Sequence, residues 1–156
     1  MNSILYLALV LASFVPNAPD LPESFSLRSL DALDAQCPEF RKDASDAILS
    51  FTCYENSRSL ILSKALIFDG RSFIQDPDTH AKKILVDVRA IIHEDFTIKD
   101  RTKFCEVRKD SYGRCKTVYT LVGTRNFDDA ALAINPIDGR IDGFSYFVGL
   151  RWHSQK

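Results

Sequence analysis

A series of strand-like runs separated by short turns fills the second half of this 156-residue chain and constrains its fold more than any other feature. Residues 84–92 (ILVDVRAII) carry apolar side chains at every second position, which predicts a long, half-buried strand. Four further strands are predicted at residues 102–107, 117–122, 130–135 and 141–150, with hairpin turns at residues 110–113 and 138–139. Because consecutive strands joined by short turns pair antiparallel, this half predicts an antiparallel sheet.

The first half has helical rather than alternating patterns. Residues 59–70 (SLILSKALIFDG) carry a stripe with helical spacing and end at Gly70, which is typical of a helix C-terminus and predicts the main helix. A shorter helix is predicted at residues 25–35, where Ser26 is a possible N-cap, and a short strand at residues 48–53. The predicted fold class is α+β, with one main helix packed on an antiparallel sheet and an extra N-terminal helix.

The N-terminus has the pattern of an export signal. Residues 4–15 form an uncharged apolar run, whereas a bilayer-spanning helix needs about twenty residues. A run of this length at an N-terminus is typical of a signal peptide, and the alternative is a buried first helix. We expect a signal peptide at residues 1–18, an extension at 19–47, a main domain at 48–156, and a secreted protein with no membrane span.

Cysteine usage agrees with export. The chain has four cysteines, Cys37, Cys53, Cys105 and Cys115, which permit three disulfide pairings. We favour Cys37–Cys53 with Cys105–Cys115, because both bonds would close short loops. Four free buried thiols are the alternative, but they would require a reducing compartment. The cysteine and histidine spacings do not fit a zinc site, so we expect no metal.

Charge is unevenly distributed although the whole chain carries a net charge of only −1, which excludes a strongly basic protein that coats nucleic acid. Residues 19–57 carry −5 and residues 99–125 carry +5. A basic hairpin attracts phosphates, although such charges also serve simply to keep a sheet surface solvated. The candidate binding residues are Lys103, Arg108, Lys109, Tyr112, Arg114 and Lys116.

Few side chains are candidates for catalysis. The chain has no Gly-x-Ser-x-Gly motif, no phosphate-binding loop and no dinucleotide fingerprint, and no cofactor is expected. A nuclease that works without metal needs a base, an acid and a cation for the charge that develops on phosphorus. His80, Glu106 and Arg108 could supply these groups, although His80 lies in a polar segment.

Several fragments resemble the RNase-like secreted effectors of powdery mildew fungi, the RNase-like proteins associated with haustoria, which share the fold of the small guanyl-specific ribonucleases. The fragments are residues 51–54 (FTCY), 59–70, 78–80 (DTH), 104–107 (FCEV) and 131–147 (ALAINPIDGRIDGFSYF). The resemblance implies a curved, ribonuclease-like sheet, with His80 and Glu106 at vestigial catalytic positions.

Two departures from the family pattern affect the expected function. The catalytic arginine of these enzymes falls on Ala131 or Leu132 here, and their last histidine falls on Phe147. Losing both groups should make turnover negligible, so we expect a protein that is not an enzyme. The resemblance then implies a secreted virulence effector, monomeric, that binds a host plant protein or RNA and suppresses immunity. The alternatives are an active secreted ribonuclease and an unrelated exported α+β binding or inhibitor module.

Overall fold

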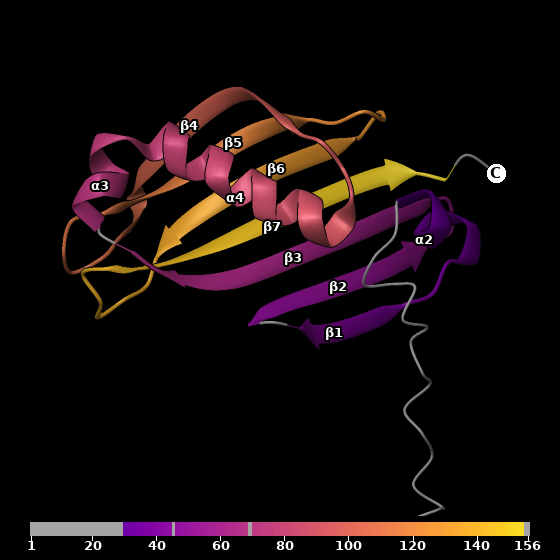
Figure 1. The fold of residues 1–156 in the computed structure, drawn as a ribbon, viewed down its shortest axis with the longest axis horizontal. Helices are drawn as coiled ribbons and strands as arrows, with labels where there is room; N and C mark the ends of the chain where they lie inside the picture. The colour runs from indigo at the N-terminus through magenta and orange to yellow at the C-terminus, as the bar shows by residue number, and fades with distance from the viewer. Residues whose placement is uncertain (1–29, 45, 69, 155–156) are drawn as a thin grey trace, which may run out of the picture.

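A seven-stranded antiparallel sheet with the order β1-β2-β3-β7-β6-β5-β4 dominates the molecule (Figure 1). The computed structural model describes residues 30–44, 46–68 and 70–154, and only the backbone of residues 44, 70–72 and 106–109. The strands are β1 (Phe40–Ala44), β2 (Ala47–Tyr54), β3 (Ser57–Ile67), β4 (Thr97–Lys109), β5 (Cys115–Val122), β6 (Asp129–Pro136) and β7 (Gly143–His153). The last strand, β7, pairs with β3 along the whole length of β3 and thereby joins the two halves of the chain.

Three described helices accompany the sheet: α2 (Leu30–Gln36), α3 (Gly70–Gln75) and α4 (Pro77–Ile92). The long helix α4 lies across one face of the sheet, while α2 and α3 lie at opposite ends of it (Figure 1). Asp76 caps α4 by accepting a hydrogen bond from the backbone N–H of Thr79 at 3.2 Å. The helix ends at His93, whose left-handed backbone places its N–H on the carbonyl of Arg89.

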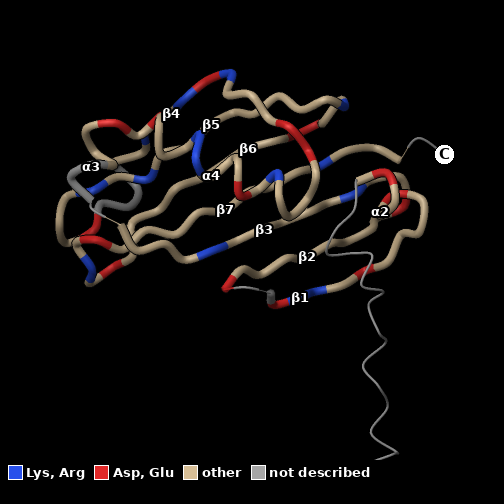
Figure 2. Tube along the Cα trace, in the orientation of Figure 1, with Lys and Arg blue, Asp and Glu red and all other residues tan. Residues whose placement is uncertain are grey.

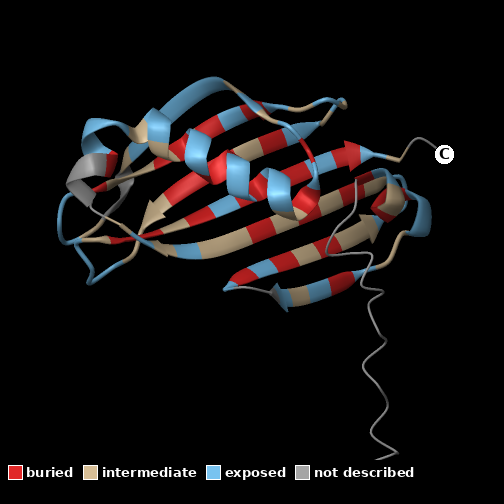
Figure 3. Ribbon diagram, viewed as in Figure 1, coloured by how far each residue is buried: buried red, intermediate tan, exposed pale blue. Residues whose placement is uncertain are grey.

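The core lies between α4 and the inner face of the sheet, which we define as the face that α4 covers. Buried and exposed residues alternate along the strands, and α4 buries one stripe and exposes the other (Figure 3). The buried residues of α4 are Ala81, Ile84, Leu85, Val88 and Ile92. They belong to one apolar cluster with the sheet residues Leu60, Leu62, Leu132, Ile134, Tyr146, Val148 and Leu150. At the α2 end, the ring of Trp152 lies 6.0 Å from that of Phe51, and Leu30 and Leu33 join the same cluster.

The outer face of the sheet, opposite α4, carries mostly small side chains. One cross-strand row on this face runs through Thr102, Val118, Ala133, Phe147, Ser63 and Ile48. Phe147 is 40% exposed there and Ile48 is 37% exposed. None of the described helices covers this face (Figure 1).

The predicted main helix at residues 59–70 is wrong, because this segment forms strand β3. Leu60, Lys64 and Phe68 have helical spacing, but Leu60 and Leu62 also fit an alternation, and both of these leucines point into the core. The strand prevails because β3 pairs with β2 on one side and with β7 on the other, so its backbone groups are satisfied within the sheet.

The predicted strand at residues 84–92 is also wrong, because these residues form the C-terminal part of α4. Their alternation coincides with a helical stripe, in which Ile84, Val88 and Ile92 are buried while Val86 is 69% exposed. The helix start that we overlooked is Asp76-Pro77, a capping residue followed by proline in the first turn.

These two exchanges correct the predicted fold class. The molecule is not one main helix at residues 59–70 packed on a curved sheet, but a β-rich sheet of seven strands in which the predicted main helix is the inner strand β3. We also did not predict β1, which pairs with β2 across the expected boundary at residue 48.

The remaining predicted strands are confirmed as β2, β4, β5, β6 and β7, and the two predicted hairpin turns lie between β4 and β5 and between β6 and β7. The short N-terminal helix appears as α2, while residues 25–29 and the predicted signal peptide lie outside the described residues. Within the described part of the chain, each helix is too short or too polar to cross a bilayer.

Candidate functional site

The β4–β5 hairpin, at the α3 end of the sheet, has a tightly hydrogen-bonded tip. Asp110 accepts hydrogen bonds from the backbone N–H groups of Tyr112 at 3.2 Å and Arg114 at 2.7 Å. The N–H of Gly113, whose φ of 74° favours glycine, bonds the carbonyl of Asp110. The Cys105–Cys115 disulfide closes this hairpin. The tip therefore holds Tyr112 on a rigid turn, where its side chain is 49% exposed.

Arg114 is the centre of this end of the molecule. Its side chain is 4% exposed and pairs with the buried carboxylate of Asp110 at 2.6 Å. The guanidinium also donates to the carbonyls of Ile137, Arg140, Ile141 and Gly143, in and beside the β6–β7 turn. It lies 4.6 Å from the ring centre of Phe144 and 5.5 Å from that of Tyr112. Arg114 thus joins the two hairpins as a structural residue.

His80 lies in the first turns of α4 and is stacked among aromatic rings near the same end. Its ring is 5.0 Å from Phe68 and nearly parallel to it, and 5.8 Å from Phe73 in an edge contact. Phe68 and Phe73 in turn contact Phe144. We had placed His80 in a polar loop ahead of a strand, whereas it belongs to a helix and packs on hydrocarbon. The side chain of Glu106 lies outside the described residues.

A half-open cavity of about 110 Å³ lies between α3, the start of α4 and the β4–β5 hairpin. Phe73, Ile74, Pro77 and Phe144 give it apolar walls, and Lys103, Arg114 and Thr117 also line it. Around this end, four large apolar side chains are exposed, which we call the tip surface: Ile67, Ile74, Tyr112 and Ile141, exposed by 66, 60, 49 and 63%. Clusters of this kind on a monomer's surface commonly mark a site of association.

The predicted basic binding residues do not form one patch. Lys103, Tyr112 and Arg114 meet at the cavity and the hairpin tip, whereas Lys116 lines a separate groove on the outer face. The side chains of Arg108 and Lys109 lie outside the described residues. Three guanidiniums of the basic segment have intramolecular partners: Arg101 pairs with Asp78 at 2.8 Å, Arg114 with Asp110, and Arg125 with Asp31. Figure 2 shows acidic and basic positions mixed along this part of the chain.

Tyr119 contributes to the Arg101–Asp78 contact from the neighbouring strand. Its hydroxyl donates to Asp78 at 3.3 Å. Burial, together with the negative charge of Asp78, raises the pKa of Tyr119 to about 12. The hydroxyl is therefore a neutral donor at physiological pH.

The outer-face groove has a volume of about 720 Å³. Phe147, Ile48 and Ala133 line it, together with Lys116 and Lys64. Ala131 lies beside it on the same face, opposite Gly149. Ala131 and Phe147 therefore place hydrocarbon on the outer face, on strands β6 and β7, whereas Leu132 is buried in the core.

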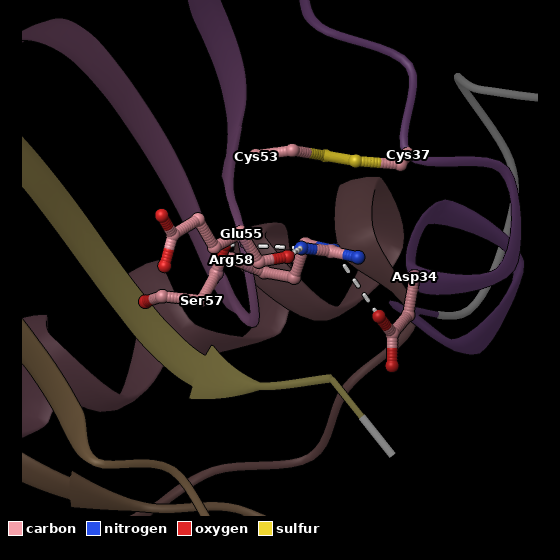
Figure 4. The surroundings of a disulfide bond; sticks show 6 residues. All are labelled: Asp34, Cys37, Cys53, Glu55, Ser57 and Arg58. Carbon is pink, nitrogen blue, oxygen red and sulfur yellow. Dashed lines mark hydrogen bonds and ion pairs between the residues drawn. A yellow bond between two sulfur atoms is a disulfide. The ribbon is translucent and has the colours of Figure 1, made fainter. Parts of the chain in front are cut away.

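The opposite end of the sheet is closed by the second disulfide and a buried ion pair (Figure 4). The Cys37–Cys53 bond ties the segment after α2 to β2. Nearby, Arg58 pairs with Asp34 of α2 at 3.2 Å and donates to the carbonyls of Glu55 and Ser57. Both predicted disulfide pairings are confirmed. These contacts hold α2 against the end of the sheet.

Among the described residues, no group of three or more histidine, cysteine, aspartate or glutamate side chains could hold a metal ion. Comparison of the chain with protein-family models, with curated proteins and with solved structures finds no match. Of the fragments on which the resemblance to the ribonucleases rests, residues 59–67 lie in strand β3 and residues 78–80 lie in helix α4.

Sequence reasoning identified Lys103, Tyr112 and Arg114 but missed the three isoleucines of the tip surface. Ile141 lies between a turn and a strand, where an exposed apolar side chain is unexpected. The position of Ile141 was therefore the one sign in the sequence of an exposed apolar residue at this end. The exposure of Ile67 and Ile74 could not be read from the sequence, because it depends on where β3 and α3 end.

Proposed function

We propose that this chain is a secreted, non-catalytic effector that binds a host protein through the tip surface. The observation that carries the proposal is the half-exposed ring of Tyr112, held by Arg114 and a hydrogen-bonded turn at the same end of the sheet as three exposed isoleucines. Aromatic anchors on rigid turns bind partners strongly, because little conformational entropy is lost on binding. Export is supported by the two disulfides, since such bonds persist in oxidising compartments.

The intramolecular ion pairs of the basic segment, residues 99–125, favour a protein over RNA as the partner. Arg114 is buried against Asp110, while Arg101 and Arg125 form intramolecular pairs with Asp78 and Asp31. Phosphate binding needs cations that can exchange their counterions for phosphate groups; the buried Arg114 is not available for this exchange, and Arg101 and Arg125 would first have to leave their carboxylates. His80 stacks on Phe68 and meets Phe73 edge-on. This packing favours a structural role for His80 over a role as a catalytic acid or base. The resemblance to mildew effectors suggests that the partner belongs to a plant.

The test compares two exposed tyrosines at different places on the molecule. Tyr112 is 49% exposed on the tip, and Tyr54, at the turn between β2 and β3, is 64% exposed. We expect the mature protein and Tyr54→Ala to suppress an immune oxidative burst in leaf cells, and Tyr112→Ala to lose this effect. A photo-crosslinker at position 112 should capture a plant protein that the same group at position 54 does not.

The captured protein is then purified and titrated with each variant. Removing a central aromatic anchor costs at least about 2 kcal/mol, so Tyr112→Ala should weaken binding about thirtyfold, with Tyr54→Ala unchanged. Equal binding by both variants would contradict the proposal. Retention of a labelled single-stranded RNA at physiological salt, lost in Lys103→Glu/Lys116→Glu, would favour RNA instead.

A further inference from the structure

Among the described side chains, the cavity beneath the tip surface combines apolar walls with one charge that forms no ion pair. Its walls are the rings of Phe73 and Phe144 with Ile74 and Pro77, and its volume is about 110 Å³. A dry apolar cavity of about 150 Å³ accommodates benzene, so this one has room for a branched aliphatic side chain and not for a large aromatic one.

The charge at this cavity comes from Lys103. Arg114 also lines it, but the Asp110 carboxylate and four backbone carbonyls already occupy its guanidinium. None of the ion pairs between described side chains involves Lys103, which is exposed on the edge strand β4 opposite Thr117. An ammonium group at the mouth of an apolar cavity attracts an anion that carries a hydrocarbon group.

We infer that this cavity is a specificity pocket for a partner segment that inserts a leucine-like side chain and places a carboxylate on Lys103. The inference rests on the proposed function, because it assigns the chemistry of the partner at the tip surface. A protein segment fits better than a free small acid, since Ile74 and Tyr112 continue the apolar surface beyond the cavity. The carboxylate comes from either an acidic neighbour of the leucine or the end of the partner chain.

Four synthetic peptides test the pocket without knowledge of the host partner. Two end in leucine, Gly-Ser-Gly-Leu as the free acid and as the amide. Two have amidated ends and carry leucine before an acidic or a neutral residue, Gly-Ser-Leu-Glu-Gly and Gly-Ser-Leu-Gln-Gly. Titration into the full mature protein, followed by the amide NMR signals of Gly113 and Thr117, measures binding at the cavity. We expect one carboxylate peptide to bind about tenfold more tightly than its neutral partner, and which one does so identifies the source of the carboxylate.

The charge is tested with two lysines of the same strand. Lys103→Met should abolish the preference for the carboxylate peptide, while Lys99→Met should keep it, because Lys99 lines a different groove. Replacing leucine by phenylalanine should weaken binding, because the cavity is too small for the ring. Equal binding within both peptide pairs, an unchanged preference in Lys103→Met, or signals that move only outside the cavity would overturn the inference.

The two proposals fail separately. If the peptides show no preference but Tyr112→Ala still loses the captured plant protein, the pocket chemistry is wrong and the tip surface stands. If the peptides bind as expected but Tyr112→Ala and Tyr54→Ala act alike in leaf cells, the pocket stands and the proposed function is wrong.

Discussion

At the scale of single residues, Arg114 was predicted to bind a ligand, but in the fold its charge has a structural role. In the sequence it is one of several cations in a basic hairpin, but the fold buries it against Asp110 and the carbonyls of the neighbouring turn. Burying a guanidinium without such partners would be very unfavourable. The partners come from both the β4–β5 and the β6–β7 hairpins, so the ion pair stabilises the geometry that presents Tyr112.

The Asp110 carboxylate should make stability depend on pH. Burial alone would raise its pKa, but the hydrogen bonds and charge of Arg114 outweigh burial and lower the pKa below the ordinary value. A lowered folded pKa stabilises the fold above the unfolded pKa of about 4, and this contribution is lost as the pH falls through the folded pKa.

We therefore expect Asp110→Asn to lower the free energy of unfolding by about 3 kcal/mol at pH 7. The difference from the wild type should shrink as the pH falls below about 4. Urea unfolding at several pH values measures it. Asp142→Asn is the control, because Asp142 forms an exposed pair with Arg140 worth at most about 1 kcal/mol. A difference that stays constant between pH 7 and pH 3 would contradict the prediction.

At the scale of elements, β3 and α4 each carry both periodicities. Within residues 60–68, Leu60 and Leu62 follow an alternation, while Leu60, Lys64 and Phe68 have helical spacing. In α4, Ile84, Val88 and Ile92 fit both patterns. Short apolar runs cannot be assigned from periodicity alone. Residues 57–67 form a strand because they pair with β2 on one side and with β7 on the other. Residues 77–92 form a helix because Asp76 caps its start and Pro77 suits its first turn.

Two exposed valines, one on α4 and one on β5, test the assignment of helix and strand. Val86 is 69% exposed on α4 and Val122 is 48% exposed on β5. Val86→Ala should raise the free energy of unfolding by about 0.5 kcal/mol, because alanine favours helix. Val122→Ala should lower the free energy of unfolding by about 0.5 kcal/mol, because valine favours strands. Guanidinium unfolding of both variants measures the pair, and a loss of stability in Val86→Ala would argue against the helix.

At the scale of the whole molecule, the sheet is secured at both ends by a disulfide and a buried Arg–Asp pair. Cys37–Cys53 and Arg58–Asp34 act at the α2 end, while Cys105–Cys115 and Arg114–Asp110 act at the tip. Cross-links that close loops stabilise a fold chiefly by restricting the unfolded chain. The tip surface is thereby presented by a scaffold that is cross-linked at both ends.

Removing each disulfide should destabilise the protein by a similar amount but with different local effects. The bonds close loops with sequence separations of 16 and 10 residues, for which chain entropy predicts about 3 kcal/mol each. Cys37→Ala/Cys53→Ala should lose amide protection in α2, and Cys105→Ala/Cys115→Ala in the β4–β5 hairpin. Chemical unfolding and hydrogen exchange measure the two effects. Loss of protection at the same residues in both variants would contradict this division.

The sequence by itself determined the antiparallel strands that follow α4, their hairpin turns and the disulfide pairing, because these depend on neighbours close along the chain. It also placed Lys103 and Tyr112 among the candidate binding residues, and it held the local signals for α4, the Asp76 cap and Pro77. Only the tertiary structure decided that β3 is a strand, and only it distinguished the buried Arg114 from the exposed Lys103. Both decisions depend on contacts between residues far apart in the chain, and local periodicity and charge carry no information about such contacts.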